Sequence, residues 1–258
     1  MPHDGGGRGG RMGLASAQGP EGADPSALLR LADFALANGD VEGSIGLYRR
    51  AAALDPADAR PFIRLGDALS RSAAYEQAAG AYRAALQIEP AAGPALSGLG
   101  GAEVALGEAE DALAPLRQAI AADPADPRAY RSLGVALDRL GRDEEARATY
   151  LAGLEHVPAD IDLRSNYALS LGLMGDSDEA IERMREAATA PAASVQHLRN
   201  YVLLLALAGR NDDASRIAAD ALDQTEHEAL ARQVEEMRAL NDREARLQAL
   251  ATIPSGAG

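Results

Sequence analysis

The stretch PRAYRSLGVALDRLGRDEEARATYLAGLEHVPAD, residues 127–160, is one copy of a 34-residue unit that occurs six times without an insertion. Its most regular positions are the fifteenth, here Gly141, and the twentieth, here Ala146. The fifteenth position holds Gly39, Ala73, Gly107, Gly141, Gly175 and Gly209, and the twentieth holds Ser44, Ala78, Ala112, Ala146, Ala180 and Ala214. A period of this length predicts one helix–turn–helix pair per unit, with a small residue at the turn.

Large and small residues alternate at other fixed positions of the unit. The eighth and twenty-seventh positions are mostly Ala or Gly, as at Gly134 and Gly153. The seventh position is large and holds Leu31, Leu65, Leu99, Leu133, Tyr167 and Tyr201. Such alternation lets neighbouring helices approach closely and interdigitate. Proline cannot continue a helix, so the second helices of the first four units are expected to end at Pro56, Pro90, Pro124 and Pro158.

The array resembles the tetratricopeptide repeat (TPR) family over residues 25–222, and the six in-register copies carry the resemblance. It implies an all-α fold, a right-handed α-solenoid of six helix–turn–helix units with a C-terminal capping helix. The predicted repeats are residues 25–58, 59–92, 93–126, 127–160, 161–194 and 195–224. We expect residues 1–24 to be a disordered Gly-rich tail, residues 225–250 the capping helix and residues 251–258 a second tail.

Composition and charge exclude several function classes. The 39 acidic and 25 basic residues give a net charge of −14, which disfavours a nucleic acid partner or an anionic lipid surface. Because the chain has no Cys, it has neither a disulfide framework nor a thiolate ligand or nucleophile. No apolar run in residues 1–24 reads as a signal peptide or membrane anchor.

The capping helix is expected to begin at a capping box formed by Thr225 and Glu228. A solenoid needs such a cap because its last unit otherwise exposes an apolar face. The alternative is that this helix docks a partner.

The concave groove is the expected binding surface, because in TPR proteins the first helix of each unit lines it. The positions concerned are the second, fifth, sixth, ninth, twelfth and thirteenth of each unit. The candidate groove residues are Arg60, Arg64, Arg128, Arg131, Asn166, Arg199, Asn200, Leu169 and Leu203, and Arg71 and Arg139 occupy groove positions as well.

The arginines suit an acidic peptide, and the asparagines suit the backbone amides of an extended one. Alternatively, the arginines pair with nearby acidic residues, the asparagines are ordinary surface polar groups, and the C-terminal helix or tail covers the leucines.

No catalytic constellation emerges from the sequence. The four histidines have no ligand-like spacing, and no segment outside the repeats is long enough for a catalytic domain. We therefore expect a non-enzyme without cofactor or metal, which binds a protein or peptide. Glu103 is unusual because its position, the eleventh, is otherwise apolar. We expect its carboxylate to reach solvent.

The segments at residues 163–171, 198–201 and 205–210 are similar to the closing repeats of TadD proteins, components of the Flp (tight adherence) pilus machinery. This resemblance implies a partner in pilus assembly or secretion. The alternative is a generic cytoplasmic adaptor or regulator with an unrelated client. TadD proteins are commonly lipoproteins, whereas this chain has no lipobox Cys. The sequence as it stands therefore predicts the cytoplasm, with the periplasm or outer membrane as the alternative.

Overall fold

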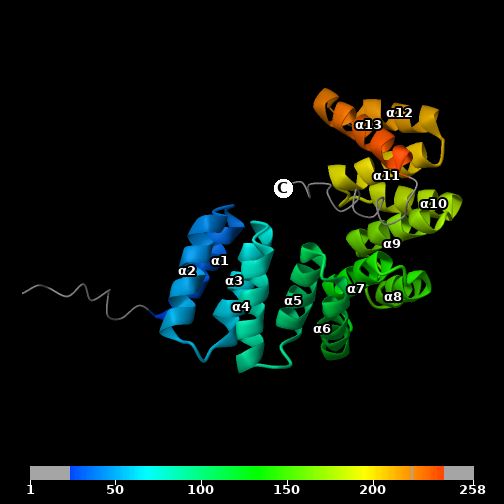
Figure 1. Cartoon of the computed structure of the whole chain (residues 1–258). Helices are drawn as coiled ribbons and strands as arrows, with labels where there is room; N and C mark the ends of the chain where they lie inside the picture. Colours follow the sequence, from blue (N-terminus) through cyan, green and yellow to red (C-terminus); the bar gives the residue numbers. More distant parts are fainter. Residues whose placement is uncertain (1–23, 222, 241–258) are drawn as a thin grey trace, which may run out of the picture.

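The computed structural model describes residues 24–221 and 223–240. Thirteen α-helices and no strand occur in these residues. The helices are α1 Pro25–Ala37, α2 Val41–Leu54, α3 Ala59–Arg71, α4 Tyr75–Ile88, α5 Gly93–Leu106, α6 Ala109–Ala122, α7 Pro127–Arg139, α8 Asp143–His156, α9 Ile161–Met174, α10 Ser177–Ala188, α11 Val195–Leu207, α12 Asn211–Ala221 and α13 Gln224–Ala239. The all-α solenoid is confirmed, since the first twelve helices form six consecutive pairs (Figure 1).

The turn inside each unit explains the small residue at the fifteenth position. All six residues there have a positive φ, from 57° at Ala73 to 94° at Gly175. This left-handed conformation costs little for glycine, whereas a Cβ makes it unfavourable. Ala73 is the one residue other than glycine that adopts it in the described chain.

The connections between units explain where the first helices begin. Asp24, Asp58, Asp126 and Asp160 each stand at the N-cap, where the side chain accepts a backbone N–H from the first turn. An aspartate in this place satisfies one of the unpaired donors of the helix and complements its dipole. The recurring Ala-Asp pair before each of these helices is thus a helix-start signal.

The small positions allow close approach of the two helices in a unit. A Cβ added to Gly134 would lie 2.3 Å from Cε1 of Tyr150, so the tyrosine ring packs directly on the α7 backbone. Gly66 stands in the same relation to Tyr82, and Gly100 to Leu116. The three large side chains are almost fully buried. Glycine is therefore required at these three positions for the close packing of the two helices in a unit.

Two predictions about buried positions are wrong. Leu31, at the seventh position, was expected to pack between helices, but 53% of it is exposed because the described chain has no unit before the first. Glu103 was expected to reach solvent, but only 4% of it is exposed. Its position faces the neighbouring unit, where the other copies carry buried leucines such as Leu137.

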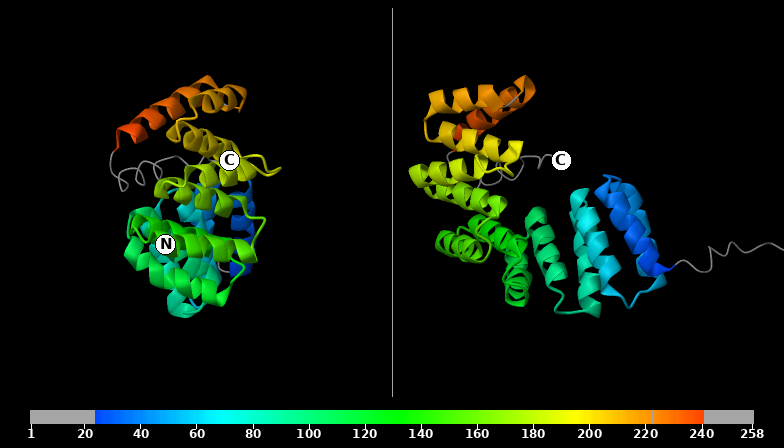
Figure 2. Two further views of the ribbon diagram at one scale, coloured as in Figure 1. Left: turned by 90° about the vertical axis from the view of Figure 1, so that its right-hand side faces the viewer. Right: turned by 180° about the vertical axis from the view of Figure 1, so that it is seen from behind.

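The array is curved, and the first helices lie on its inner side (Figures 1 and 2). Successive first helices contact one another from α3 through α5, α7 and α9 to α11. Each second helix contacts the first helix of the next unit, as α4 contacts α5. Because the first helices crowd together, the surface that they form on the inner side of the array is concave, and the groove positions of the sequence lie together on it.

The last helix, α13, packs on α11 and buries Leu230 and Val234. It begins at Gln224, and its capping box is formed by Asp223 and Glu226, not by Thr225 and Glu228 as predicted. Asp223 Oδ1 accepts the N–H of Glu226 at 2.8 Å, and Glu226 Oε2 accepts that of Asp223 at 3.1 Å. The predicted tail at residues 1–23, the end of the capping helix at residues 241–250 and the tail at residues 251–258 lie outside the described residues.

Candidate binding groove

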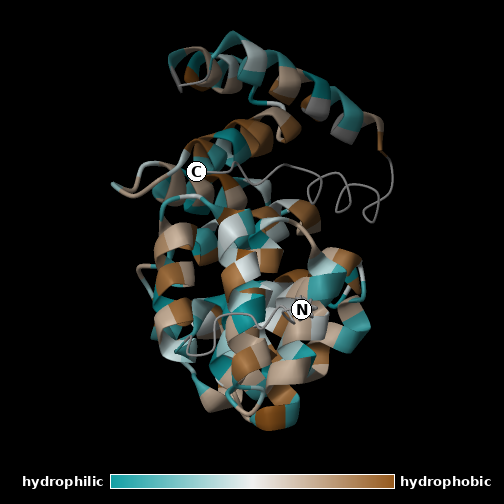
Figure 3. Ribbon diagram, turned by 90° about the vertical axis from the view of Figure 1, so that its left-hand side faces the viewer, coloured by the Kyte–Doolittle hydropathy of each residue, from teal (hydrophilic) through white to brown (hydrophobic). Residues whose placement is uncertain are grey.

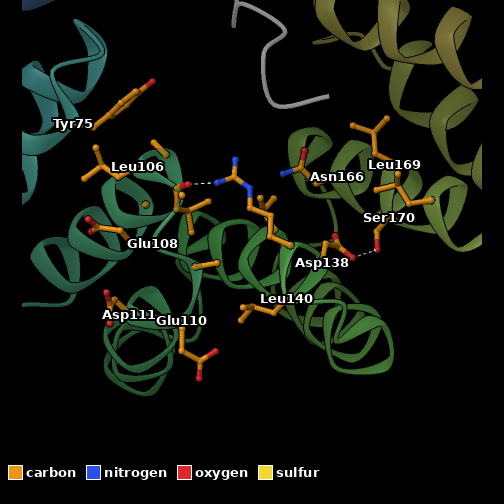
Figure 4. Close-up of a pocket in the computed structure, with 18 of the residues that line it drawn as sticks. Tyr75, Leu106, Glu108, Glu110, Asp111, Asp138, Leu140, Asn166, Leu169 and Ser170 are labelled. Atoms are coloured by element: carbon orange, nitrogen blue, oxygen red, sulfur yellow. Dashed lines mark hydrogen bonds between the residues drawn. The ribbon is translucent and has the colours of Figure 1, made fainter. Parts of the chain in front are cut away.

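The concave face contains two adjoining cavities. The larger, of about 930 Å³, is lined by residues of α5, α6, α7 and α9 (Figure 4). The smaller, of about 380 Å³, is lined by residues of α3, α4, α5 and α7. Gly101 and Tyr75 border both cavities. The groove therefore runs continuously from the second unit to the fifth.

Three small residues of the third unit line the smaller cavity, and one of them, Gly101, also lines the larger. The fifth, sixth and ninth positions of this unit are Ser97, Gly98 and Gly101, and we call this surface the unit-three hollow. A Cβ added to Gly98 would lie 2.3 Å from Cζ of Tyr82, so the close packing of α4 on α5 requires glycine here. Gly101 leaves open space in the groove, since the nearest atom to an added Cβ there is Oγ of Ser132 at 3.5 Å.

Ser97 gives the hollow an unused polar group. Only 3% of the residue is exposed, and its Oγ has no hydrogen-bond partner among the described residues. A buried hydroxyl without a partner costs free energy. The sequence prediction of the groove missed the hollow, although three small residues at groove positions were its signal.

Three of the predicted groove arginines are paired with acidic residues. Arg60 holds Asp58 at 2.8 Å, and Arg64 lies 3.9 Å from Asp33. Arg128 lies 3.2 Å from Asp126 and 3.8 Å from Asp67. The sequence left open whether these arginines pair with nearby acidic residues, and the contacts show that they do. These side chains are partly exposed, so the pairs are weak and a client's carboxylate can compete for the arginines.

Arg131 belongs to a chain of contacts that spans three units. Its Nη1 lies 2.7 Å from Asp162 and 3.4 Å from Asp160 at the start of α9. Asp162 also lies 3.1 Å from Nε2 of His197, which is buried at the start of α11. Ser194 N–H donates to Nδ1 of the same ring at 3.1 Å. Arg131 therefore helps to join the fourth, fifth and sixth units.

Two other groove arginines have no acidic partner among the described residues, namely Arg71 and Arg139. Arg71 lines the smaller cavity and Arg139 the larger one. Nη1 of Arg139 donates to the carbonyl of Val104, and burial lowers the pKa of its guanidinium. Both cations flank the unit-three hollow, one from the second unit and one from the fourth.

In the C-terminal part of the predicted site, some residues line the larger cavity and others are buried. Asn166 and Leu169, both on α9, line the larger cavity, and Figure 4 shows them at its rim. Leu203 is wrong as a groove residue because it is fully buried in the core. Asn200 is also wrong, since only 6% of it is exposed and its amide donates to Ser165 Oγ at 3.2 Å.

Arg199 is half-buried on α11, and its Nε has no hydrogen-bond acceptor in the described part of the chain. The structure thus leaves seven of the nine predicted residues exposed or half-buried. They are Arg60, Arg64, Arg128 and Arg131 on the first helices of the second and fourth units, Asn166 and Leu169 at the larger cavity, and Arg199 in the sixth unit.

A buried hydrogen-bond network stabilises the wall of the larger cavity. Tyr150 donates to Asp138 Oδ2 at 3.0 Å. Ser170 donates to Oδ1 of the same carboxylate at 2.7 Å (Figure 4). Burial raises the pKa of the Tyr150 hydroxyl. Both partners of Asp138 are thus held in place, and the network joins α7, α8 and α9.

No three His, Asp or Glu side chains within the described residues gather as a metal site. Among the helices of residues 24–221 and 223–240, none is long and apolar enough to cross a bilayer.

The family model of the tetratricopeptide repeat matches residues 14–59, 63–127 and 99–161, which together make up more than half of the chain. The chain belongs to the TPR family. Members of this family are protein-interaction scaffolds, and the family fold is a non-catalytic one. No curated protein matches the chain by sequence.

Several solved TPR structures share the fold. PilW, a type IV pilus biogenesis factor, has a TM-score of 0.68 at 17% identity, covering 77% of this chain and 93% of PilW. PilF of Pseudomonas aeruginosa has a TM-score of 0.63 at 18% identity, covering 81% of this chain and 97% of PilF. YrrB, a TPR protein with an unusual peptide-binding site, has a TM-score of 0.52 at 22% identity, covering 68% of this chain and 90% of YrrB.

Proposed function

We propose that this TPR protein binds an extended, acidic segment of a partner protein in the concave groove of units two to five. The observation that carries this proposal is the unit-three hollow, flanked by the guanidinium groups of Arg71 and Arg139 without acidic partners among the described residues.

Local ion pairing, and not net charge, favours an acidic client. The chain as a whole is acidic and carboxylates such as Asp67 and Glu108 line the same two cavities, yet neither Arg71 nor Arg139 forms an ion pair with a described residue. Burial lowers the pKa of Arg139, so a carboxylate beside it would recover part of the free energy that desolvation costs. Arginine forms paired hydrogen bonds with a carboxylate, which are stronger than neutral ones.

The shape of the hollow favours an extended segment. Without a side chain at Gly101, a client backbone can approach α5 closely. Beyond the hollow, Val135, Leu169 and Leu173 line the larger cavity and offer apolar contact to a client side chain.

A double variant tests this function. We expect Arg71→Ala with Arg139→Ala to reduce the amount of client captured from an extract of the native host, with binding at least about tenfold weaker. The matched control is Arg50→Ala with Arg232→Ala, which removes the same charge from exposed side chains of α2 and α13. Equal capture by both double variants would overturn the groove proposal.

We further propose that the client belongs to a pilus-assembly or secretion machine. The TadD-like segments support this proposal, as does the fold shared with PilW and PilF. The alternative is a generic adaptor or regulator with an unrelated client. Genes for a pilus ATPase and a secretin beside this gene favour the first, and a client of another kind in the capture experiment favours the second.

The proposed location is the cytoplasm, with the periplasm or the outer membrane as the alternative. Fractionation of native cells with an antibody against the protein distinguishes the three locations.

A further inference from the structure

The outer face of the first unit carries an apolar stripe that is buried in every other unit. Ala27, Leu31 and Phe34, at the third, seventh and tenth positions, are exposed on α1, with 68% of Phe34 accessible. At the tenth position the next three units have alanines that are at most 2% exposed. Figure 3 looks onto this end of the array and shows hydrophobic segments on its helices. The stripe is a stacking face without a neighbour among the described residues.

In the rest of the array this face is covered by the second helix of the preceding unit. Ala119, at the twenty-seventh position of α6, shares one buried cluster with Ala129, at the third position of α7. A Cβ added to Gly153, also at a twenty-seventh position, would lie 2.9 Å from Leu163, at the next third position. The twenty-seventh position therefore contacts the third position of the following unit.

The sequence before α1 continues the same register. Glu21-Gly22-Ala23-Asp24-Pro25 stands 34 residues before Asp55-Pro56-Ala57-Asp58-Ala59 and 102 residues before Asp123-Pro124-Ala125-Asp126-Pro127. These are the connections between units. In this register Leu14 occupies the twenty-fourth position of a preceding unit and Ala17 the twenty-seventh, the two positions that face inward elsewhere. The family match also begins at residue 14.

We propose that residues 14–20 dock on the first unit and cover Ala27, Leu31 and Phe34. Ala17 meets Ala27 as Ala119 meets Ala129. The segment reads LASAQGP, with small residues at four of its seven positions counting Gly19, which leaves room for a phenylalanine where other units have alanine. The sequence alone predicted a disordered tail at residues 1–24, and this proposal assigns its second half to the array.

Because the chain has no native Cys, engineered cysteines test the contact cleanly. We expect Ala17→Cys with Ala27→Cys to form an intramolecular disulfide under mild oxidation of the full chain. The control is Ser16→Cys with Ala27→Cys, because position 26 is exposed in other units, as at Arg50 and Gln118. The contact should make the first pair cross-link at least about tenfold faster than the control, since it raises the effective concentration of the thiols.

Three results would overturn the proposal. Equal rates for both pairs mean that the segment does not dock in this register. Disulfide-linked dimers of the first pair mean that a second copy covers the stripe. Finally, unchanged hydrogen exchange of α1 in a chain without residues 1–20 means that the segment covers nothing, provided that α3 to α11 keep their protection in the same sample.

Discussion

Arg83 of α4 places its Nη2 2.8 Å from Oε1 of Glu103 on α5, and so neutralises the one carboxylate that occupies the eleventh position of a unit. Only 6% of the Glu103 side chain is exposed, against 55% of that of Arg83. The second oxygen, Oε2, has no partner among the described residues. Burial raises the pKa of Glu103, and Arg83 offsets only part of this effect. The third unit therefore keeps a charge where its neighbours have leucine.

We expect Glu103→Leu to raise the free energy of unfolding by about 1–2 kcal/mol, because replacing a buried ion pair with apolar packing is often stabilising. Urea unfolding followed by circular dichroism measures the change. The exposed Arg83 loses little, since water solvates it. Arg83→Ala serves as the comparison and should destabilise the protein, because it leaves the carboxylate unpaired. A loss of stability in Glu103→Leu would mean that the pair stabilises the fold.

The same carboxyl group predicts a pH dependence. Its pKa in the folded protein is above the usual 4.5, so the folded state holds the proton more tightly than the unfolded state. The stabilisation from this group is complete below pH 4.5 and is lost as pH rises through the folded pKa. Relative to Glu103→Gln, the wild-type protein should lose stability as pH rises above 4.5. Parallel stability curves for the two proteins would contradict the assignment.

We expect replacement of Ala73 by glycine to raise the stability of the protein, although helical proteins usually favour alanine over glycine. Its φ of 57° carries the steric cost of a Cβ in the left-handed region, which is about 1–2 kcal/mol. We expect Ala73→Gly to raise thermal stability and Gly141→Ala, at the same position two units later, to lower it by a similar amount. Calorimetry of both variants checks the prediction. The same direction of change in both would be inconsistent with the turn geometry.

The sequence predicted the repeat register well because it depends on local constraints. A positive φ at Gly175, an N-cap at Asp160 and a tight contact at Gly134 each restrict one position strongly. The groove was predicted less well, since exposure there depends on how units stack. Leu203 and Leu169 share the ninth position, yet one is buried in the core and the other lines a cavity.

Pairing was the second feature that position alone did not reveal. Arg131 and Arg139 are both groove arginines of α7, but of the two only Arg131 forms ion pairs among the described residues, with carboxylates at the start of α9. The sequence spacing of 31 residues between Arg131 and Asp162 gave no local signal. Which groove arginines lack an acidic partner could therefore be learned only from the packed structure.

The contact between α13 and α11 should protect the last unit. Leu230 is 3% exposed and packs beside Val202 and Ala206 of α11. We expect Leu230→Ala to cost about 2–5 kcal/mol locally. Hydrogen exchange should then increase in α11 and α12 but not in α1 to α6, because units of a solenoid contact only their neighbours. Leu230→Met, which conserves volume, is the control. Unchanged exchange in α11 would mean that α13 is not a cap.

Arg131, Asn166 and Arg199 test whether the client extends beyond the hollow toward the C-terminal units. Replacing all three by Ala should weaken client binding at least about tenfold, because it removes two charged donors and one amide.

The contacts of Arg131 with Asp160 and Asp162 add a consequence for stability. The single variant Arg131→Ala should lower the melting temperature slightly, whereas Asn166→Ala should not, since Asn166 lines the cavity without a described partner. Binding measured with the single variants separates the two effects, because only a direct contact weakens binding without a change in melting temperature. Binding that survives the triple change would place the client on the convex face, on α13 or on the N-terminal segment.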